Sequence, residues 1–150
     1  MYACTESKLP QHGNVSAFKI DSISGKITFI HKQSCGGENP VYLTIDNSNK
    51  YIIDGNYTEG NVTVFKTNAD GSINPYSQII QFTDSSVNKA RQEKAHIHST
   101  VFSPNNDFIY FPDLGADKIR VFKFDTSNSK PLSDASNYTV RTPLGGGPRH

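Results

Sequence analysis

Two histidines, His96 and His98, stand one residue apart in the middle of the chain. In a β-strand, side chains two residues apart lie on the same face, so both imidazoles would point the same way. Such a pair can ligate zinc, but a metal site needs a third ligand, and no cysteine or carboxylate partner is signalled nearby. Two interpretations stay open: polar residues that satisfy turn backbone groups, or a site that binds substrate or transfers protons near neutral pH. We expect no metal and no other cofactor.

A second candidate is the segment Gly-Gly-Gly-Pro-Arg-His, which carries Arg149 and His150. Glycines let the backbone run close to a ligand or to a neighbouring strand. An arginine after Gly-Pro is usually a surface ion-pair partner. Beside a reactive histidine, however, its guanidinium suits an anion or a developing oxyanion.

The elements that must position these residues repeat along the chain. Residues 43–66 align without a gap onto residues 100–123, an offset of 57 residues, and a weaker copy of the second half lies at residues 14–19. Each copy consists of short segments rich in Val, Ile, Phe and Tyr that are separated by turn clusters. Self-similarity of this kind is typical of β-propeller blades. We therefore predict an all-β propeller of four-stranded antiparallel blades.

The repeat also predicts how the chain is divided. The segments are the end of one blade at 1–31, a full blade at 40–80, a long rim loop at 81–95, a full blade at 96–141 and the start of another blade at 147–150. The predicted strands lie near 41–46, 50–55, 61–66 and 72–80, and again near 99–103, 108–112, 118–124 and 132–141. Because a closed propeller needs at least four blades, we expect an incomplete arc of about two full and two partial blades.

Strand direction predicts where the chemistry lies. Because strands alternate in direction, the ends of the second strands, the starts of the first strands and the long loop all meet on one rim. Loops longer than about 12–15 residues tend to be functional. The candidate substrate-binding residues on this rim are Lys89, Arg91, Gln92, His96, Asn56, Asp113 and His150.

The composition of the chain limits the classes of partner that we expect. With 15 basic and 14 acidic residues the net charge is +1, which favours neither nucleic acid nor a membrane surface. No segment approaches the roughly 18 apolar residues of a membrane span, and no signal-peptide pattern is present, so we predict a cytoplasmic protein. Cys4 and Cys35 fit neither a disulfide framework nor a zinc pattern and are expected to be free thiols.

Several segments together resemble the lactonase family of seven-bladed propellers, which contains bacterial 6-phosphogluconolactonases and fungal carboxy-cis,cis-muconate lactonizing enzymes. They are NPVYLTID, GNYTEGNVTVFKTNADGSI, SVNKARQEKAHIHSTVFSPNNDFIYFPDLGADKIRVFKFD and GGGPRH. The resemblance covers essentially all 150 residues, so that seven blades would be expected in the complete protein. It implies an active site in the mouth of the central channel, with His98 and Arg149 as the catalytic pair.

The resemblance implies hydrolysis of a sugar lactone in carbohydrate metabolism, most simply 6-phosphogluconolactone of the pentose phosphate route. His98 would be the general base, Arg149 would stabilise the oxyanion, and Lys89 and Arg91 could hold a phosphate or carboxylate. One alternative is the lactonization of a muconate, with His98 as proton donor. Another is a propeller that binds a ligand or partner without catalysis.

The expected partner is thus a phosphorylated or carboxylated lactone, and the full-length protein is expected to be a monomer. An isolated arc would leave apolar strand edges and blade faces uncovered. We therefore expect the 150 residues alone to be inactive and poorly soluble.

Overall fold

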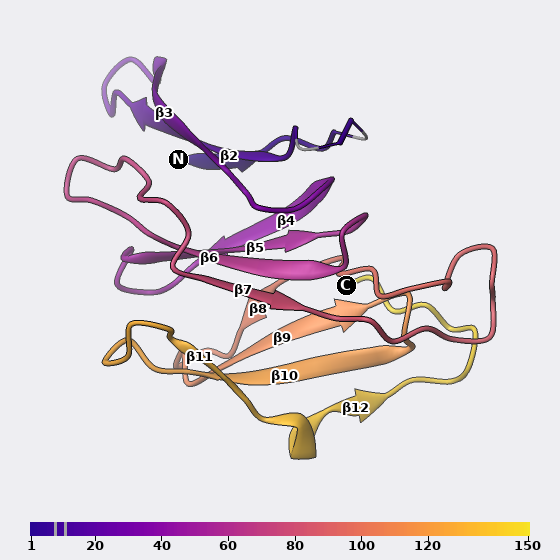
Figure 1. Cartoon of the computed structure of the whole chain (residues 1–150). Coiled ribbons are helices and arrows are strands. Elements are labelled where there is room, and N and C mark those ends of the chain that lie inside the picture. The colour runs from indigo at the N-terminus through magenta and orange to yellow at the C-terminus, as the bar shows by residue number, and fades with distance from the viewer. Residues whose placement is uncertain (8, 11) are drawn as a thin grey trace.

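The computed structural model describes residues 1–7, 9–10 and 12–150, and it consists of three antiparallel sheets that follow one another along the chain. In Figure 1 the sheets lie one below another, from the N-terminal sheet at the top to the C-terminal sheet at the bottom. The middle sheet therefore has a neighbour on each face. The predicted all-β arc of antiparallel propeller blades is confirmed.

Each sheet is a run of hairpins. The first sheet has the order β1-β2-β3 and the middle sheet the order β4-β5-β6-β7, whereas in the third sheet β8, β9 and β10 are joined by β11 and β12, which both pair with β10. The strand bounds are β1 Tyr2–Cys4, β2 Asn14–Ile20, β3 Ile27–Ser34, β4 Pro40–Ile45, β5 Tyr51–Asn56, β6 Asn61–Lys66, β7 Gln78–Gln81, β8 Val101–Phe102, β9 Phe108–Asp113, β10 Lys118–Phe124, β11 Leu132–Asp134 and β12 Val140–Arg141.

Two apolar cores lie between the sheets, and the alternation of side chains along β5 explains both. Tyr51 and Ile53 pack with residues of the third sheet such as Ile109. Ile52, between them, packs with Val15 of the first sheet. Since successive side chains of a strand point to opposite faces, the three consecutive apolar residues at the start of β5 fit a sheet covered on both faces.

The two copies of the repeat occupy equivalent places in the middle and third sheets. Pro40 pairs with Asn56 in the middle sheet, and Ile97 pairs with Asp113 in the third. Both residues of the second pair lie 57 positions after those of the first. The sequence repeat therefore corresponds to a repeat of backbone register.

The outer strand of the middle sheet is shorter than the predicted strand at 72–80, and that prediction is wrong for residues 72–77. Only Gln78–Gln81 forms β7. Pro75 has no N–H to give to a ladder, and the Ser72 N–H donates to Asp70 Oδ1 at 2.9 Å, which closes a turn.

The third sheet departs from the prediction in two places. A 3-10 helix at Ser136–Tyr138 divides the strand predicted at 132–141 into β11 and β12. The inner strand predicted at 99–103 is reduced to Val101–Phe102, with an isolated bridge at Ile97. Within the described residues, no helix has the length and apolar character needed to cross a membrane.

Candidate active site

The C-terminal segment lies against the start of the third sheet and places Arg149 on His98, a separation of 51 residues in the sequence. Arg149 Nε donates a hydrogen bond to His98 Nε2 at 2.9 Å. The ring of His150 lies edge-to-face with that of His98 at 5.1 Å, and the ring of Tyr57 lies edge-to-face on it at 5.7 Å. Three side chains from two segments thus meet around the imidazole of His98.

His98 is half-buried, and its environment favours the neutral ring. Burial, then the charge of Arg149, lowers the pKa of His98. Because Nε2 accepts from Arg149, a neutral His98 carries its proton on Nδ1, which is buried and has no hydrogen-bond partner in the described part of the chain. The backbone holds the residue in place, since the His98 N–H donates to the Pro112 carbonyl at 3.0 Å. The arrangement directs the lone pair of Nε2 at Arg149.

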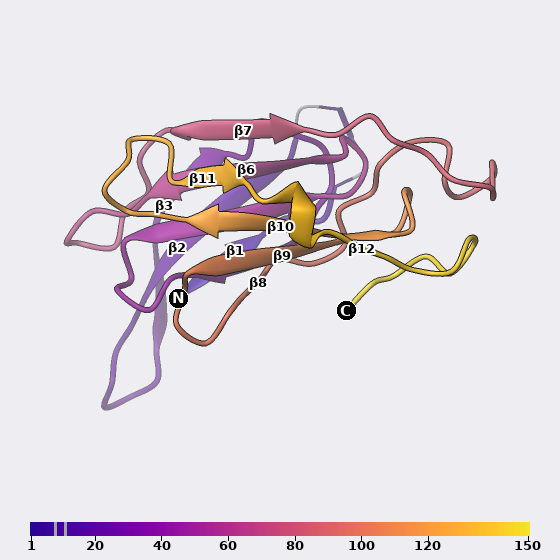
Figure 2. The same cartoon turned by 90° about the horizontal axis from the view of Figure 1, so that it is seen from below.

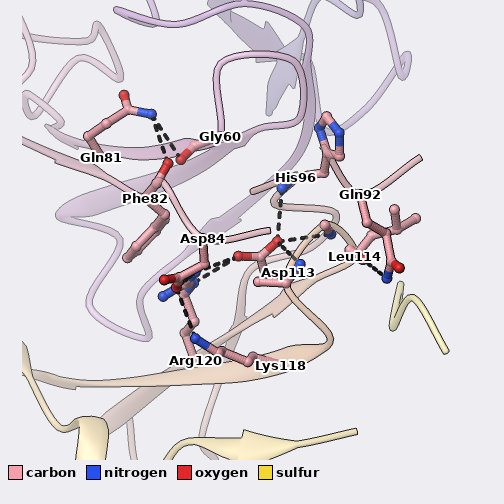
Figure 3. A network of polar contacts seen from close by, with 12 residues as sticks. Gly60, Gln81, Phe82, Asp84, Gln92, His96, Asp113, Leu114, Lys118 and Arg120 are labelled. Carbon is pink, nitrogen blue, oxygen red and sulfur yellow. Dashed lines mark hydrogen bonds and ion pairs between the residues drawn. The ribbon is translucent and has the colours of Figure 1, made fainter. Parts of the chain in front are cut away.

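Asp113, at the end of β9, holds the strand start that carries the two histidines (Figure 3). Its Oδ1 accepts from the N–H groups of His96 at 2.8 Å, Gly115 at 3.0 Å and Ala116 at 3.2 Å. Its Oδ2 accepts from Arg120 Nε at 2.9 Å and Nη2 at 2.8 Å. The fully buried carboxylate therefore accepts five hydrogen bonds. These bonds join the end of β9 to β10 and to the backbone of residue 96.

Arg120 connects Asp113 to the long loop, because its guanidinium also pairs with a residue there. Its guanidinium lies 4.1 Å from the centroid of the Phe82 ring and pairs with Asp84, which also accepts from Lys118 Nζ at 3.0 Å. These hydrogen bonds, from Arg120 first, lower the pKa of the Asp84 carboxyl. The first residues after β7 are thereby tied to β10, as Figure 3 shows.

His96 is buried, and both of its ring nitrogens are used within the protein. Nδ1 lies 2.8 Å from the Tyr57 carbonyl oxygen, and Nε2 lies 3.2 Å from Glu93 Oε1. The ring also stacks on that of Tyr57, with centroids 4.3 Å apart. His96 therefore supports Tyr57, which in turn contacts His98.

Gln92 and Asn56 are likewise buried and hydrogen-bonded. Gln92 Nε2 donates to the Leu114 carbonyl at 2.8 Å and to Asp117 Oδ1 at 2.7 Å. Asn56 Nδ2 donates to Thr63 Oγ1 at 3.3 Å, and its Oδ1 accepts from the Cys35 thiol at 3.0 Å. Cys4 and Cys35 are free thiols, as predicted.

A family model described as "Lactonase, 7-bladed beta-propeller" matches residues 1–150. The chain belongs to this lactonase family. It is 38% identical over 150 residues to a 6-phosphogluconolactonase of Formosa agariphila, covering all of this chain and 42% of that protein. It is 32% identical over 143 residues to the 6-phosphogluconolactonase of Bacillus subtilis, covering 95% of this chain and 39% of that protein.

Solved structures agree. A crystal structure of a Bacteroides fragilis protein matches with a TM-score of 0.92 at 32% identity, over 99% of this chain and 42% of that one. The periplasmic gluconolactonase of Pseudomonas aeruginosa matches with a TM-score of 0.89 at 31% identity, over 99% of this chain and 43% of that one. The chain spans about two fifths of the length of the relatives it matches.

The remaining candidates of this lactonase-family chain lie on the outside of the rim. Figure 2 shows the loop after β7 and the C-terminal segment at the same end of the sheets. Lys89 and Arg91 are exposed on that loop, as is His150 on the C-terminal segment. Lys89 Nζ reaches only Ser85 Oγ, at 3.4 Å, and neither cation pairs with a carboxylate among the described residues.

Sequence reasoning did not single out Asp117, which is buried at the start of β10 and accepts four hydrogen bonds. Its backbone is left-handed, with φ of 51°. Aspartate is among the residues that adopt this conformation in turns. The run Asp-Leu-Gly-Ala-Asp at 113–117 therefore indicates a turn that ends at Asp117. Its donors come from segments 25 to 31 residues away, which no local pattern reveals.

Within the described residues, no group of three or more His, Cys, Asp or Glu side chains is arranged to hold a metal ion. The two histidines of the His-x-His pair do different things. His96 faces Tyr57 and Glu93, whereas His98 faces Arg149.

Proposed function

We propose that the propeller to which this chain contributes hydrolyses a sugar lactone, with 6-phosphogluconolactone as the substrate class. The observation that carries the proposal is the contact between Arg149 Nε and His98 Nε2 at 2.9 Å. It joins a neutral imidazole and a permanent cation, which are the two groups that the addition of water to an ester carbonyl requires.

His98 is the general base in this mechanism. Its Nε2 lone pair takes a proton from water as the water oxygen attacks the lactone carbonyl carbon. The guanidinium of Arg149 turns from Nε2 toward the carbonyl oxygen and stabilises the negative charge that develops there. When the ring C–O bond breaks, the protonated His98 returns the proton to the departing alkoxide oxygen. The product is the open-chain hydroxy acid.

The lowered pKa of His98 favours hydrolysis over the lactonization of a muconate. Hydrolysis needs a neutral imidazole, and burial and the Arg149 charge both disfavour the protonated ring. Lactonization would use His98 as the proton donor and so needs the form that this environment opposes. A propeller that only binds would turn over neither substrate, which the same assay tests.

Substrate contacts are proposed on the exposed residues of the rim. Lys89 and Arg91 are cations without carboxylate partners among the described residues, so they are free to hold a phosphate or carboxylate. His150 lies beside His98 at the mouth of the site. The polar atoms of His96, Gln92, Asn56 and Asp113 are used within the protein, and we propose that these residues shape the site.

The test is turnover by the complete propeller that carries residues 1–150. We expect His98→Asn and Arg149→Lys each to lower kcat/KM for 6-phosphogluconolactone by about 100-fold or more, which is the usual effect of losing a general base or an oxyanion donor. His31→Asn in β3 and Arg141→Lys in β12 are matched controls outside the site. Near wild-type turnover in either His98→Asn or Arg149→Lys would contradict the mechanism. Activity only on a carboxymuconate would contradict the substrate.

A cytoplasmic location, a monomeric state and the division into blades at 1–31, 40–80, 96–141 and 147–150 stay predictions. The long rim loop at 81–95 is likewise a prediction. Each can be tested on the complete protein, by cell fractionation, by light scattering and by limited proteolysis at the predicted boundaries.

A further inference from the structure

We propose that Asp117 is the positioning residue that holds Arg149 against His98. The inference rests on the proposed function for its importance, because it concerns the placement of the catalytic pair. Its physical content is the contact between Arg149 and His98, which can be measured without a substrate.

The carboxylate of Asp117 joins three segments of the chain. Oδ1 accepts from Gln92 Nε2 at 2.7 Å and from the Gly147 N–H at 2.8 Å. Oδ2 accepts from Ser86 Oγ at 2.5 Å and from the Gly145 N–H at 2.7 Å. Two donors come from the long rim loop and two from the segment that leads to Arg149. The second backbone anchor, Gly147, lies two residues before Arg149.

Two of the three consecutive glycines are explained by this contact. Gly145 and Gly147 both have left-handed backbones, with φ of 78° and 56°, which side chains other than Gly, Asn and Asp rarely adopt. In this conformation both N–H groups face one carboxylate, Gly145 donating to Oδ2 and Gly147 to Oδ1. That carboxylate belongs to Asp117. The glycines therefore fasten the segment to the protein, while Arg149 is left to face the rim.

The charge of Asp117 is satisfied by neutral donors only. Burial raises the pKa of Asp117. Hydrogen bonds from Ser86, Gly147 and Gly145 nevertheless lower that pKa to about 2. No lysine or arginine pairs with this carboxylate in the described part of the chain. The donors belong to two segments, the long rim loop and the segment that leads to Arg149, so this one carboxylate links them.

The other full repeat provides an internal comparison. The position equivalent to Asp117 is Gly60, which is also left-handed, with φ of 75°. The backbone turn is therefore the same in both repeats, but the middle sheet has no carboxylate there. The carboxylate occurs only beside the segment that carries Arg149.

The test uses Asp117→Asn in the protein that carries residues 1–150. Oδ1 and Oδ2 each accept one glycine N–H, so either orientation of the new amide sets its NH₂ group against one of them. The measurement is the titration of the His98 ring by NMR with ¹⁵N-labelled histidine. We expect the His98 midpoint to rise, because the Arg149 charge that lowers its pKa moves away.

The direction of the shift separates positioning from a direct charge effect. The ionisable groups that act on His98 are Arg149, His150 and Glu6, and none of them is altered in Asp117→Asn. Removing a negative charge would by itself lower the midpoint. A rise therefore reports the loss of Arg149. The variant Arg149→Gln gives the full rise of the His98 midpoint. The double variant Asp117→Asn with Arg149→Gln should have the same His98 midpoint as Arg149→Gln alone.

Asp46→Asn is the matched control. Asp46 is buried, and its two oxygens accept the N–H groups of Ser48, Lys50 and Tyr51 in the turn after β4. The same substitution there should lower stability and leave the His98 midpoint unchanged. If Asp117→Asn does not fold, Asp117→Gly suits the left-handed backbone and removes all four contacts.

Two results would overturn the proposal. One is an unchanged His98 midpoint in the Asp117 variant while Arg149→Gln raises it, which would show that Arg149 stays in place without Asp117. The other is an unchanged midpoint in Arg149→Gln, which would show that the pair does not form in solution. A rise in both variants in a protein that hydrolyses no lactone would support the positioning and contradict the proposed function.

Discussion

The turn that joins β5 to β6 and the turn that joins β9 to β10 have the same backbone and different chemistry. In the first, Asn56 is bonded to Thr63 and to the thiol of Cys35, so every partner is neutral. In the second, the equivalent positions are Asp113 and Arg120, which form a buried charged pair. The charged turn holds the N–H of His96, two residues before His98, whereas the neutral turn contributes the Tyr57 ring that lies on His98. The comparison indicates that the repeat supplies the scaffold and that substitutions within it supply the site.

The strand interiors differ in the same way. Asp54 in β5 is equivalent to Phe111 in β9, and both side chains are fully buried. Neither carboxyl oxygen of Asp54 has a hydrogen-bond partner in the described structure. Burial therefore raises the pKa of Asp54 well above its usual value.

The largest predicted effect separates the middle sheet from the third sheet. The middle sheet is covered on both faces, whereas the third has an apolar groove lined by Val101, Tyr110, Val121 and Val140. We expect residues 1–150 expressed alone to associate through this face and to hydrolyse no lactone, because apolar patches of this kind drive association. Size-exclusion chromatography and a lactonase assay test this. A monodisperse, active monomer would contradict it.

Asp113→Asn gives the turn between β9 and β10 the residue that Asn56 provides in the turn between β5 and β6. It should destabilise the protein by about 2–4 kcal/mol, because Arg120 keeps its buried charge and loses one of its two carboxylate partners, Asp84 being the other. The free energy of unfolding in denaturant measures this.

The double variant Asp113→Asn with Arg120→Thr reproduces the Asn56–Thr63 pair and should recover part of the loss. Stability equal to the sum of the two single losses would show that the charged pair is not coupled.

Asp54→Asn tests the buried carboxyl group. A group whose folded pKa is raised contributes fully below its unfolded pKa of about 3.9, and the contribution is lost as the pH rises toward the folded value. The variant should thus be nearest the wild type in stability at about pH 4 and should gain on it as the pH rises further. Thermal unfolding across this range measures the difference. A difference independent of pH would show that Asp54 is not forced to stay protonated.

The fold was predictable because its signals are local. Runs such as Tyr51–Ile53 are apolar at every position, and turn residues separate them at regular spacing, so the sheets and their burial on both faces follow. The outer strands were less predictable, since Pro75 and the 3-10 helix at Ser136–Tyr138 interrupt segments that have strand-like composition.

By itself, the sequence determined the repeat and the antiparallel order of the strands, and it predicted one rim for His98 and Arg149. These follow from periodicities that each strand carries in its own residues. Only the tertiary structure decided that His96 is buried against Tyr57 while His98 meets Arg149, and that Asp117 holds the glycine segment. The physical reason is distance along the chain. The hydrogen bonds that place the two histidines, His96 with Asp113 and His98 with Arg149, join residues 17 and 51 positions apart, and these partners are set by how the sheets stack.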